Sequence, residues 1–338
     1  MKQIVLKSYC KGLPKESDFA VEDIPTPTPK EGEFLVRHIW ASVDPGSRSR
    51  LSGQDSYSGA HQLGDSMSGF NVGVVELSQN ADWPVGTKLT CAGGWATHSI
   101  QNGRGFLAKI PEGIDLPLSY WIGVLGVPGL TGWFGLKRVG EFKEGDRVLV
   151  SSAAGPVGAT AGQLAKTSGA AQVVGIAGSD EKCAWLTDVA GFDHAINYKT
   201  VSDLDAAISE AMPKGIDLLF DNVGNAMIDR CLPKMRMNGR IVISGQVADY
   251  NVAPEERHGI KNTIAFISNR IKMQGLVVFD DARQYPEALT SMAGMIAKGE
   301  LKLKEELFDG IENMPAAFCG LFRGVNFGRR LTRVGEET

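Results

Sequence analysis

One stretch, residues 147–182, constrains the fold of this chain more than any other. It reads RVLVSSAAGPVGATAGQLAKTSGAAQVVGIAGSDEK. A β-branched run at 148–150 is followed by a turn of small residues and then by good helix formers at 159–166. A second apolar run at 172–177 completes a strand–helix–strand unit. This order predicts a doubly wound parallel sheet, with a dinucleotide-binding turn at the end of its first strand.

The turn itself follows the pattern A-x-G-x-x-G, with Ala153 in the first glycine position. Gly155 would let the backbone approach a pyrophosphate, and Gly158 would let helix and strand pack closely. Pro156 suits an early helical position, and the helix N-terminus would present amides to the phosphates. Any α/β protein can carry a tight glycine turn, so the interpretation depends on the flanking strands.

The residues after the second strand indicate which dinucleotide binds. NAD sites usually place Asp or Glu about 20 residues beyond the glycines. Here Gly178 stands in that place, followed by Ser179 and, three residues later, Lys182. A small residue, a hydroxyl and a cation suit the 2′-phosphate of NADP. The alternative is that Ser179 only caps a helix and that Lys182 lies on a solvated face.

The length of 338 residues predicts two domains, because one core rarely holds so long a chain. Short strands and turns over residues 1–120 indicate a β-rich, barrel-like domain. Residues 121–300 alternate strands and helices, with a last strand expected at 270–279, as a parallel sheet requires. Residues 301–338 are expected to return to the first domain.

Composition excludes several classes of function. A net charge of −4 argues against a nucleic-acid-binding surface. No apolar run is long enough to span a membrane, and no signal peptide is expected at the start. The five cysteines are scattered, which indicates a reducing, cytoplasmic compartment.

Nine motifs, in order along the chain, carry a family resemblance. They are VDPGSR (43–48), WATHSI (95–100), VPGLTGWFGL (127–136), AAGPVG (153–158), GSDEK (178–182), NYKT (197–200), FDNVG (220–224), ENMPAAF (312–318) and NFGRR (326–330). With them the chain resembles the zinc-independent medium-chain dehydrogenases/reductases, in the group of leukotriene B4 dehydrogenases, prostaglandin reductases and curcumin reductases. The resemblance implies a GroES-like catalytic domain built from both termini, a Rossmann NADP-binding domain between them, and a homodimer.

The resemblance also implies a set of contacts to NADP(H), matched position by position. The backbone at Gly155, Pro156 and Val157 would hold the pyrophosphate, and Gly178, Ser179, Lys182 and Tyr198 would surround the 2′-phosphate. Asn222 would lie beside the ribose, and the remaining matches would line the cofactor or approach its nicotinamide: Pro128, Thr131, Gly245, Tyr250, Val277, Phe279 and Asn326. For Tyr198 and Asn222 the alternatives are a half-buried aromatic at a strand end and an asparagine turn cap.

Zinc is not expected. The zinc-dependent members of the wider superfamily supply a cysteine where this chain reads ASVDP (41–45), and they carry G-H-E where it reads LGD (63–65). The histidines are isolated in sequence and no cysteine cluster exists, so no metal site is predicted. The carbonyl of a substrate would then be polarised by hydrogen bonds.

The function implied by the resemblance is NADPH-dependent reduction of the C=C bond of α,β-unsaturated ketones and aldehydes. Hydride would reach the β-carbon and leave negative charge on the carbonyl oxygen. Tyr250 is a candidate donor to that oxygen, and Tyr57 a candidate lid or proton-delivery residue, although either could be an exposed loop tyrosine. A quinone reductase or alcohol dehydrogenase on the same fold, and a non-catalytic NADPH-binding protein, remain as alternatives.

Overall fold

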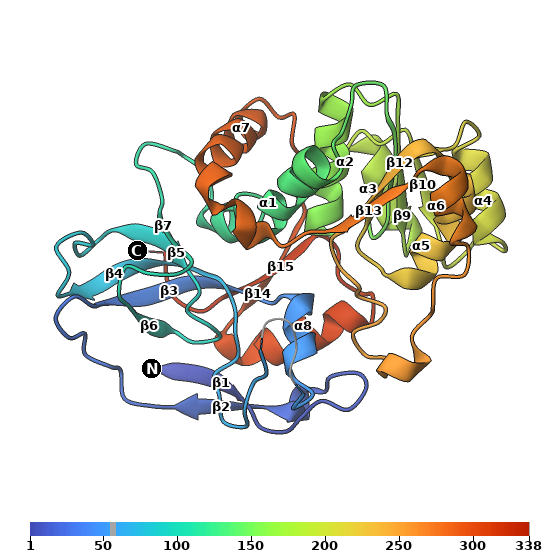
Figure 1. The fold of residues 1–338 in the computed structure, drawn as a ribbon. Coiled ribbons are helices and arrows are strands. Elements are labelled where there is room, and N and C mark those ends of the chain that lie inside the picture. The colour runs from blue at the N-terminus through green and yellow to red at the C-terminus, as the bar shows by residue number, and fades with distance from the viewer. Residues whose placement is uncertain (55–58, 338) are drawn as a thin grey trace. The chain divides into compact units, whose positions relative to one another are not determined.

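A computed structural model describes residues 1–54 and 59–337 of the chain (Figure 1). Its contacts divide the chain into two compact units. Unit 1 contains Met1–Ile122 and Glu305–Thr338, and unit 2 contains Gly123–Lys304.

Unit 2 contains a six-stranded parallel sheet with the order β10-β9-β8-β11-β12-β13. Counted within the sheet this is 3-2-1-4-5-6, the Rossmann order, so the prediction of a doubly wound parallel sheet is confirmed. The strand order reverses between β8 and β11, and ligands of such sheets bind outside the carboxyl ends of the strands at that point. The strands are β8 (Arg147–Val150), β9 (Gln172–Ala177), β10 (His194–Asn197), β11 (Ile216–Asp221), β12 (Met235–Ile243) and β13 (Lys272–Gly275).

The strands of unit 2 are apolar because helices cover the sheet. One buried cluster joins strand residues such as Leu149, Val174 and Leu219 to Ile208 of α4 and Ile228 of α5. Burying such side chains contributes about 1.5–3 kcal/mol each relative to leaving them exposed. The helices are α1 (Val127–Phe134), α2 (Pro156–Thr167), α3 (Asp180–Asp188), α4 (Leu204–Ala211), α5 (Asn225–Cys231), α6 (Ile264–Asn269) and α7 (Tyr285–Ala297).

The last strand of unit 2 is shorter than the sequence predicts. In place of a strand over 270–279, β13 ends at Gly275, and the Leu276 N–H makes the last bond to β12. The Asp280 N–H then bonds back to the Val277 carbonyl at 3.2 Å, which begins a 3-10 turn. Asp281 in that turn pairs with Arg138 at 2.8 Å.

Unit 1 is built on a mainly antiparallel seven-stranded sheet, ordered β14-β15-β3-β4-β5-β7, with β6 also paired to β3. Strands from both ends of the chain meet in it, since β15 pairs with β3 and appears red beside blue in Figure 1. Phe318 of α8 (Met314–Phe322) packs on Trp95 in the largest core of this unit. The sheet strands are β3 (Phe34–Ser42), β4 (Asn71–Ser78), β5 (Lys88–Cys91), β6 (His98–Gln101), β7 (Leu107–Lys109), β14 (Glu305–Asp309) and β15 (Arg329–Arg333), and β1 (Lys2–Leu6) pairs separately with β2 (Phe19–Asp23).

Within the described ranges, every helix is too short or too polar to cross a bilayer.

Candidate functional site

The N-terminus of α2 faces the end of β8, as the glycine pattern predicts. Gly155 is the N-cap residue and Pro156 the first helical residue, and no side chain of the described residues caps this terminus. A Cβ at Gly158 would lie 2.8 Å from the Ser152 carbonyl oxygen and 2.9 Å from the Ala153 Cα, so only glycine lets the helix approach this closely. The first-turn amides therefore have no intrahelical acceptor, which makes this terminus suitable for an anion.

Helix α1 adds two of the predicted cofactor residues beside that terminus. A Cβ at Gly132 would lie 3.0 Å from the Val157 carbonyl oxygen, so α1 and α2 pack with their backbones close together. Pro128 is buried in α1. The Thr131 hydroxyl donates to the Val127 carbonyl at 2.7 Å and is half-buried.

Four residues predicted for the 2′-phosphate come together at the ends of β9 and β10. A Cβ at Gly178 would lie 2.9 Å from the Tyr198 ring and 3.2 Å from its hydroxyl oxygen. Ser179 is the N-cap of α3, where its Oγ accepts from the Lys182 N–H at 3.3 Å. The capping role considered from the sequence is thus present, and it places Lys182 in the first turn of the helix that follows Gly178.

Lys199 is a further cation at this place that sequence reasoning missed. Its Cε would lie 3.3 Å from a Cβ at Gly178, and its Nζ is 6.0 Å from the centre of the Tyr198 ring. The motif NYKT contains it, but only contact with Gly178 distinguishes it from other exposed lysines. Asn197 fixes the start of this turn, because its Nδ2 donates to Asp180 Oδ1 at 2.7 Å.

Asn222 lies where β8 and β11 end side by side. Its backbone N–H donates to Ser151 Oγ and its Nδ2 to the Ser151 carbonyl, each at 2.8 Å. The asparagine is therefore held across the two strand ends at the point where the strand order reverses. Ser151 and Asp221, which complete this arrangement, were not singled out from the sequence, although buried polar residues at the ends of apolar strands are the available signal.

Gly245 and Tyr250 belong to the same edge of the sheet. A Cβ at Gly245 would lie 3.4 Å from the Asn222 carbonyl oxygen and 3.7 Å from the Tyr250 hydroxyl. That hydroxyl accepts from the Gln246 N–H at 3.4 Å, and Tyr250 is half-buried. The hydroxyl thus points toward the turn that contacts Asn222.

The other predicted residues are more scattered. Val277 and Phe279 follow β13 and are 44% and 49% exposed, which is unusual for large apolar side chains. Asn326 lies in unit 1, just before β15. Tyr57 lies outside the described residues.

The segment 41–45 holds a carboxylate that is already neutralised within unit 1. Arg329, which is buried, donates from its guanidinium to Asp44 Oδ1 at 2.7 Å, and the Ser42 hydroxyl donates to Asp44 Oδ2 at 2.5 Å. The described part of the chain contains no group of three or more His, Cys, Asp or Glu side chains arranged to hold a metal ion. His38 has both ring nitrogens engaged, and burial lowers its pKa to about 4.

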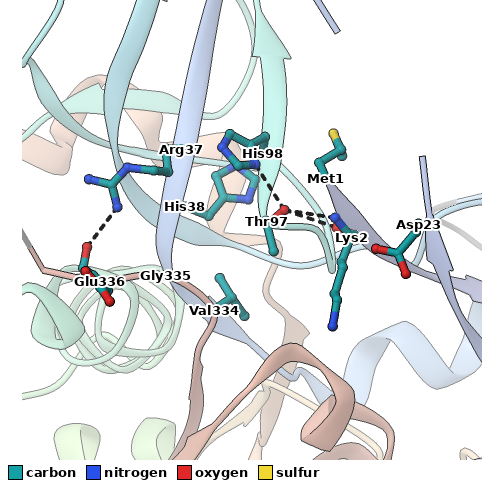
Figure 2. Close-up of a pocket in the computed structure, with 10 residues that line it drawn as sticks. All are labelled: Met1, Lys2, Asp23, Arg37, His38, Thr97, His98, Val334, Gly335 and Glu336. Carbon is teal, nitrogen blue, oxygen red and sulfur yellow. Dashed lines mark hydrogen bonds between the residues drawn. The ribbon is translucent and has the colours of Figure 1, made fainter. Parts of the chain in front are cut away.

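A separate pocket of about 520 Å³ opens on unit 1 and is lined from both ends of the chain (Figure 2). Its walls carry Lys2, Asp23, Arg37 and His98, with Val334 and Glu336 from the C-terminal segment. Arg37 donates to the Glu336 carbonyl at 2.8 Å. None of the residues predicted for the cofactor lines it, and charges of both signs face it.

Comparison with known proteins covers nearly the whole chain. Residues 2–109 match a family model described as the N-terminal domain of oxidoreductase, and residues 156–294 match one described as zinc-binding dehydrogenase. Prostaglandin reductase 1 of Bos taurus is 40% identical over 336 residues, 98% of each chain. The NADP(+)-dependent 2-alkenal reductase of Nicotiana tabacum is 38% identical over 99% of this chain and 98% of its own. The crystal structure of CurA in complex with NADPH from Vibrio vulnificus superposes with a TM-score of 0.93 at 35% identity, covering 99% of this chain and 100% of that one.

A Rossmann sheet with a glycine turn at the reversal of strand order, joined to a β-rich unit, defines a two-domain dinucleotide-binding oxidoreductase. The chain belongs to the medium-chain dehydrogenase/reductase family, in its group of prostaglandin, alkenal and curcumin reductases. The resemblance inferred from the sequence motifs is thereby confirmed.

Proposed function

We propose that this chain uses NADPH to reduce the C=C bond of α,β-unsaturated ketones and aldehydes. The chain is an NADP-dependent oxidoreductase, like its relatives over their full length. The observation that carries the proposal is the contact between Gly178, after β9, and Tyr198, after β10, with Lys182 in the first turn of the helix that follows Gly178. This arrangement suits a dinucleotide with a 2′-phosphate. The name of the tobacco relative, an alkenal reductase, supports the choice of bond.

The residues of unit 2 fit NADPH. The uncapped N-terminus of α2 would receive the pyrophosphate, with Gly155 and Val157 supplying backbone amides. Lys182 and Tyr198 would contact the 2′-phosphate, and Asn222 the adjoining ribose. Gly178 and Gly245 leave space where a Cβ would contact Tyr198 and Asn222, which keeps the edge of the sheet open. When bound, NADPH supplies the hydride that reaches the β-carbon of the substrate.

Tyr250 is the proposed donor to the substrate. Addition of hydride at the β-carbon places negative charge on the carbonyl oxygen, and hydrogen-bond donors in a dry site stabilise such charge strongly. The N–H of Gln246 donates to the Tyr250 hydroxyl oxygen, which orients the phenol at the cofactor edge. Tyr57 is kept as a proposed lid or proton-delivery residue.

We propose that the reaction needs no metal. The segment 41–45 contains no cysteine, and its one carboxylate, Asp44, is paired with the buried Arg329. A carboxylate committed to an internal arginine is a poor ligand for zinc.

We propose a homodimer in the cytoplasm. β13 is an edge strand, and Ile264 and Ile267 on the adjacent α6 are 70% and 76% exposed, a surface that a second copy would cover. Sedimentation should give a dimer, and Ile267→Lys should shift it toward monomer. All five cysteines are free, as a reducing compartment favours, and cell fractionation tests the location.

The test of the proposed function is NADPH oxidation across matched substrates. Enones and enals should be turned over, whereas the corresponding saturated ketones and aldehydes should not. Preference for quinones or for saturated carbonyls would favour the alternative oxidoreductases. Binding of NADPH without turnover of any class would favour a non-catalytic role.

A further inference from the structure

Asp221, the last residue of β11, gathers donors from two strand ends although it is completely buried. The Ser151 hydroxyl donates to its Oδ1 at 2.6 Å. The backbone N–H groups of Gly224 and Val223 donate to its Oδ2 at 2.8 and 3.3 Å. Three donors on one carboxylate favour the ionised form of a group that burial would otherwise keep neutral.

Through these bonds Asp221 connects the segments that carry the candidate cofactor residues. Ser151 Oγ, which donates to the carboxylate, also accepts the Asn222 N–H at 2.8 Å. The backbone carbonyl of Asp221 accepts from Ser244 at 2.8 Å and from Gly245 at 3.4 Å, which ties in the turn that leads to Tyr250. Hydrogen bonds to Asp221 therefore connect the ends of β8, β11 and β12.

A second buried carboxylate, Asp249, faces the same place from the turn after β12. It is 8% exposed, and its Oδ2 has no hydrogen-bond partner among the described residues. A Cβ at Gly224 would lie 2.5 Å from that oxygen, so Asp249 packs against the backbone that donates to Asp221. Two buried carboxylates this close repel each other when both are ionised.

Burial and the groups around Asp221 set its proton affinity. Burial, and to a smaller extent the charge of Asp249, raise the pKa of Asp221 to about 6, against the lowering effect of its three hydrogen bonds. The Cys231 thiol of α5 also faces it. Burial first, and then the charge of Asp221, raise the pKa of that thiol to about 12, so it remains neutral.

We propose that Asp221 is a positioning residue for NADPH: its ionised carboxylate holds Asn222 through Ser151, and its backbone carbonyl holds the start of the 244–250 turn. The nearby carboxylate of Asp249 should make this arrangement easier to protonate. The inference rests on the proposed use of NADPH. A proton on Oδ2 would point an O–H at the Gly224 and Val223 N–H groups, which can only donate, and a neutral carboxyl would accept more weakly from the Ser151 hydroxyl. The bonds that orient Asn222 through Ser151 would then weaken.

The free energy of unfolding and the affinity for the cofactor should change with pH in opposite directions. A pKa raised by folding means that the folded state binds the proton more tightly than the unfolded state does. Asp221 therefore makes the free energy of unfolding rise as the pH falls through about 6 toward the unfolded value. Cofactor affinity should fall over the same range, whereas a merely structural role would leave affinity unchanged or make it follow stability.

The experiment measures the dissociation constants of NADPH and NADH between pH 5 and pH 8, on the whole chain and without substrate. NADH is included because the 2′-phosphate of NADPH titrates near pH 6 itself. For the wild type, NADH affinity should fall about tenfold per pH unit below the inflection, as one linked proton requires. Asp249→Asn should move the inflection to lower pH, and Asp221→Asn should weaken binding at pH 8 and remove the acid limb.

Asp217→Asn is the matched control, because Asp217 is buried on the same strand but pairs with Arg147 and Arg236. This substitution should leave the pH profile of cofactor binding unchanged. An inflection that does not move in Asp249→Asn would overturn the proposal, even if Asp221→Asn fails to fold. So would a wild-type profile for NADH that is flat. Binding is read without turnover, so neither result depends on which bond the enzyme reduces.

Discussion

At the scale of single residues, we propose that Lys182 decides between the two nicotinamide cofactors. It lies one turn into α3, whose N-cap Ser179 follows Gly178 directly. Only NADPH offers a phosphate at this place, since the ribose of NADH carries a hydroxyl. A charged hydrogen bond contributes roughly 1.5–3 kcal/mol, which corresponds to one to two decades in affinity.

Lys182→Ala should therefore weaken NADPH binding by about tenfold to a hundredfold while NADH binding changes little. Titration of each cofactor by fluorescence measures this, with exposed Lys214→Ala as the control for loss of one surface cation. Lys199→Ala should show a smaller effect in the same direction. Equal losses for both cofactors would place Lys182 outside the 2′-phosphate contact.

Tyr250 acts, on this account, in the chemical step. Tyr250→Phe keeps the ring but removes the donor, so kcat and kcat/KM should fall together by about a hundredfold, as for other oxyanion donors. NADPH affinity should stay close to that of the wild type. An unchanged kcat would assign Tyr250 to packing and leave the ribose hydroxyl of the cofactor as the donor.

The sequence predicted residues that belong to local patterns, but not residues that only the tertiary fold brings together. Gly158 follows from a pattern of spacing, and the structure shows the close contact that requires it. Ser151 and Asp221 are 70 positions apart, so nothing in the sequence indicates that they share a hydrogen bond. Lys199 was missed for the same reason, because only the fold brings it to Gly178.

At the scale of elements, the turn between β8 and α2 contains two glycines with different roles, one expected to contact the cofactor and one needed for packing. Gly155 has an ordinary φ of −78°, and a Cβ there would lie 3.3 Å from the Ser152 carbonyl oxygen. At Gly158 an added Cβ would meet backbone atoms at 2.8 and 2.9 Å. At the first position a shift of a few tenths of an ångström would relieve the contact, whereas at the second the helix itself must move.

Gly158→Ala should thus lower the free energy of unfolding by about 1–3 kcal/mol, the usual cost of overpacking. Gly155→Ala should change stability little but weaken NADPH and NADH equally, because the pyrophosphate is common to both. Chemical denaturation and cofactor titration on the two variants separate these effects. A large stability loss in Gly155→Ala, with affinity intact, would contradict this division.

The strands of unit 2 were predictable where they are apolar and buried on both faces. Residues 172–177 form β9 with the expected bounds. The last strand was predicted too long: a local turn begins at Val277, and the Arg138–Asp281 ion pair beside it joins residues far apart in the sequence. Helix α8 was not predicted from its residues, because it is only nine residues long and largely buried.

At the scale of the whole molecule, the proposal that the reaction needs no metal can be tested without substitution. The family model that matches residues 156–294 is described as a zinc-binding dehydrogenase, yet Asp44 is paired with Arg329 and no cysteine lies nearby in sequence. The purified protein should contain no stoichiometric zinc by mass spectrometry, and chelators should leave its activity intact. Activity lost on chelation and restored by Zn²⁺ would show that a ligand set had been missed.

The central claim is that hydride reaches the β-carbon of an enone. Reduction of an enone with NADPH deuterated at the transferring position of the nicotinamide, followed by NMR of the product, tests it directly. The account predicts a saturated ketone with its carbonyl intact and deuterium on the β-carbon. An allylic alcohol with deuterium on the former carbonyl carbon would contradict it.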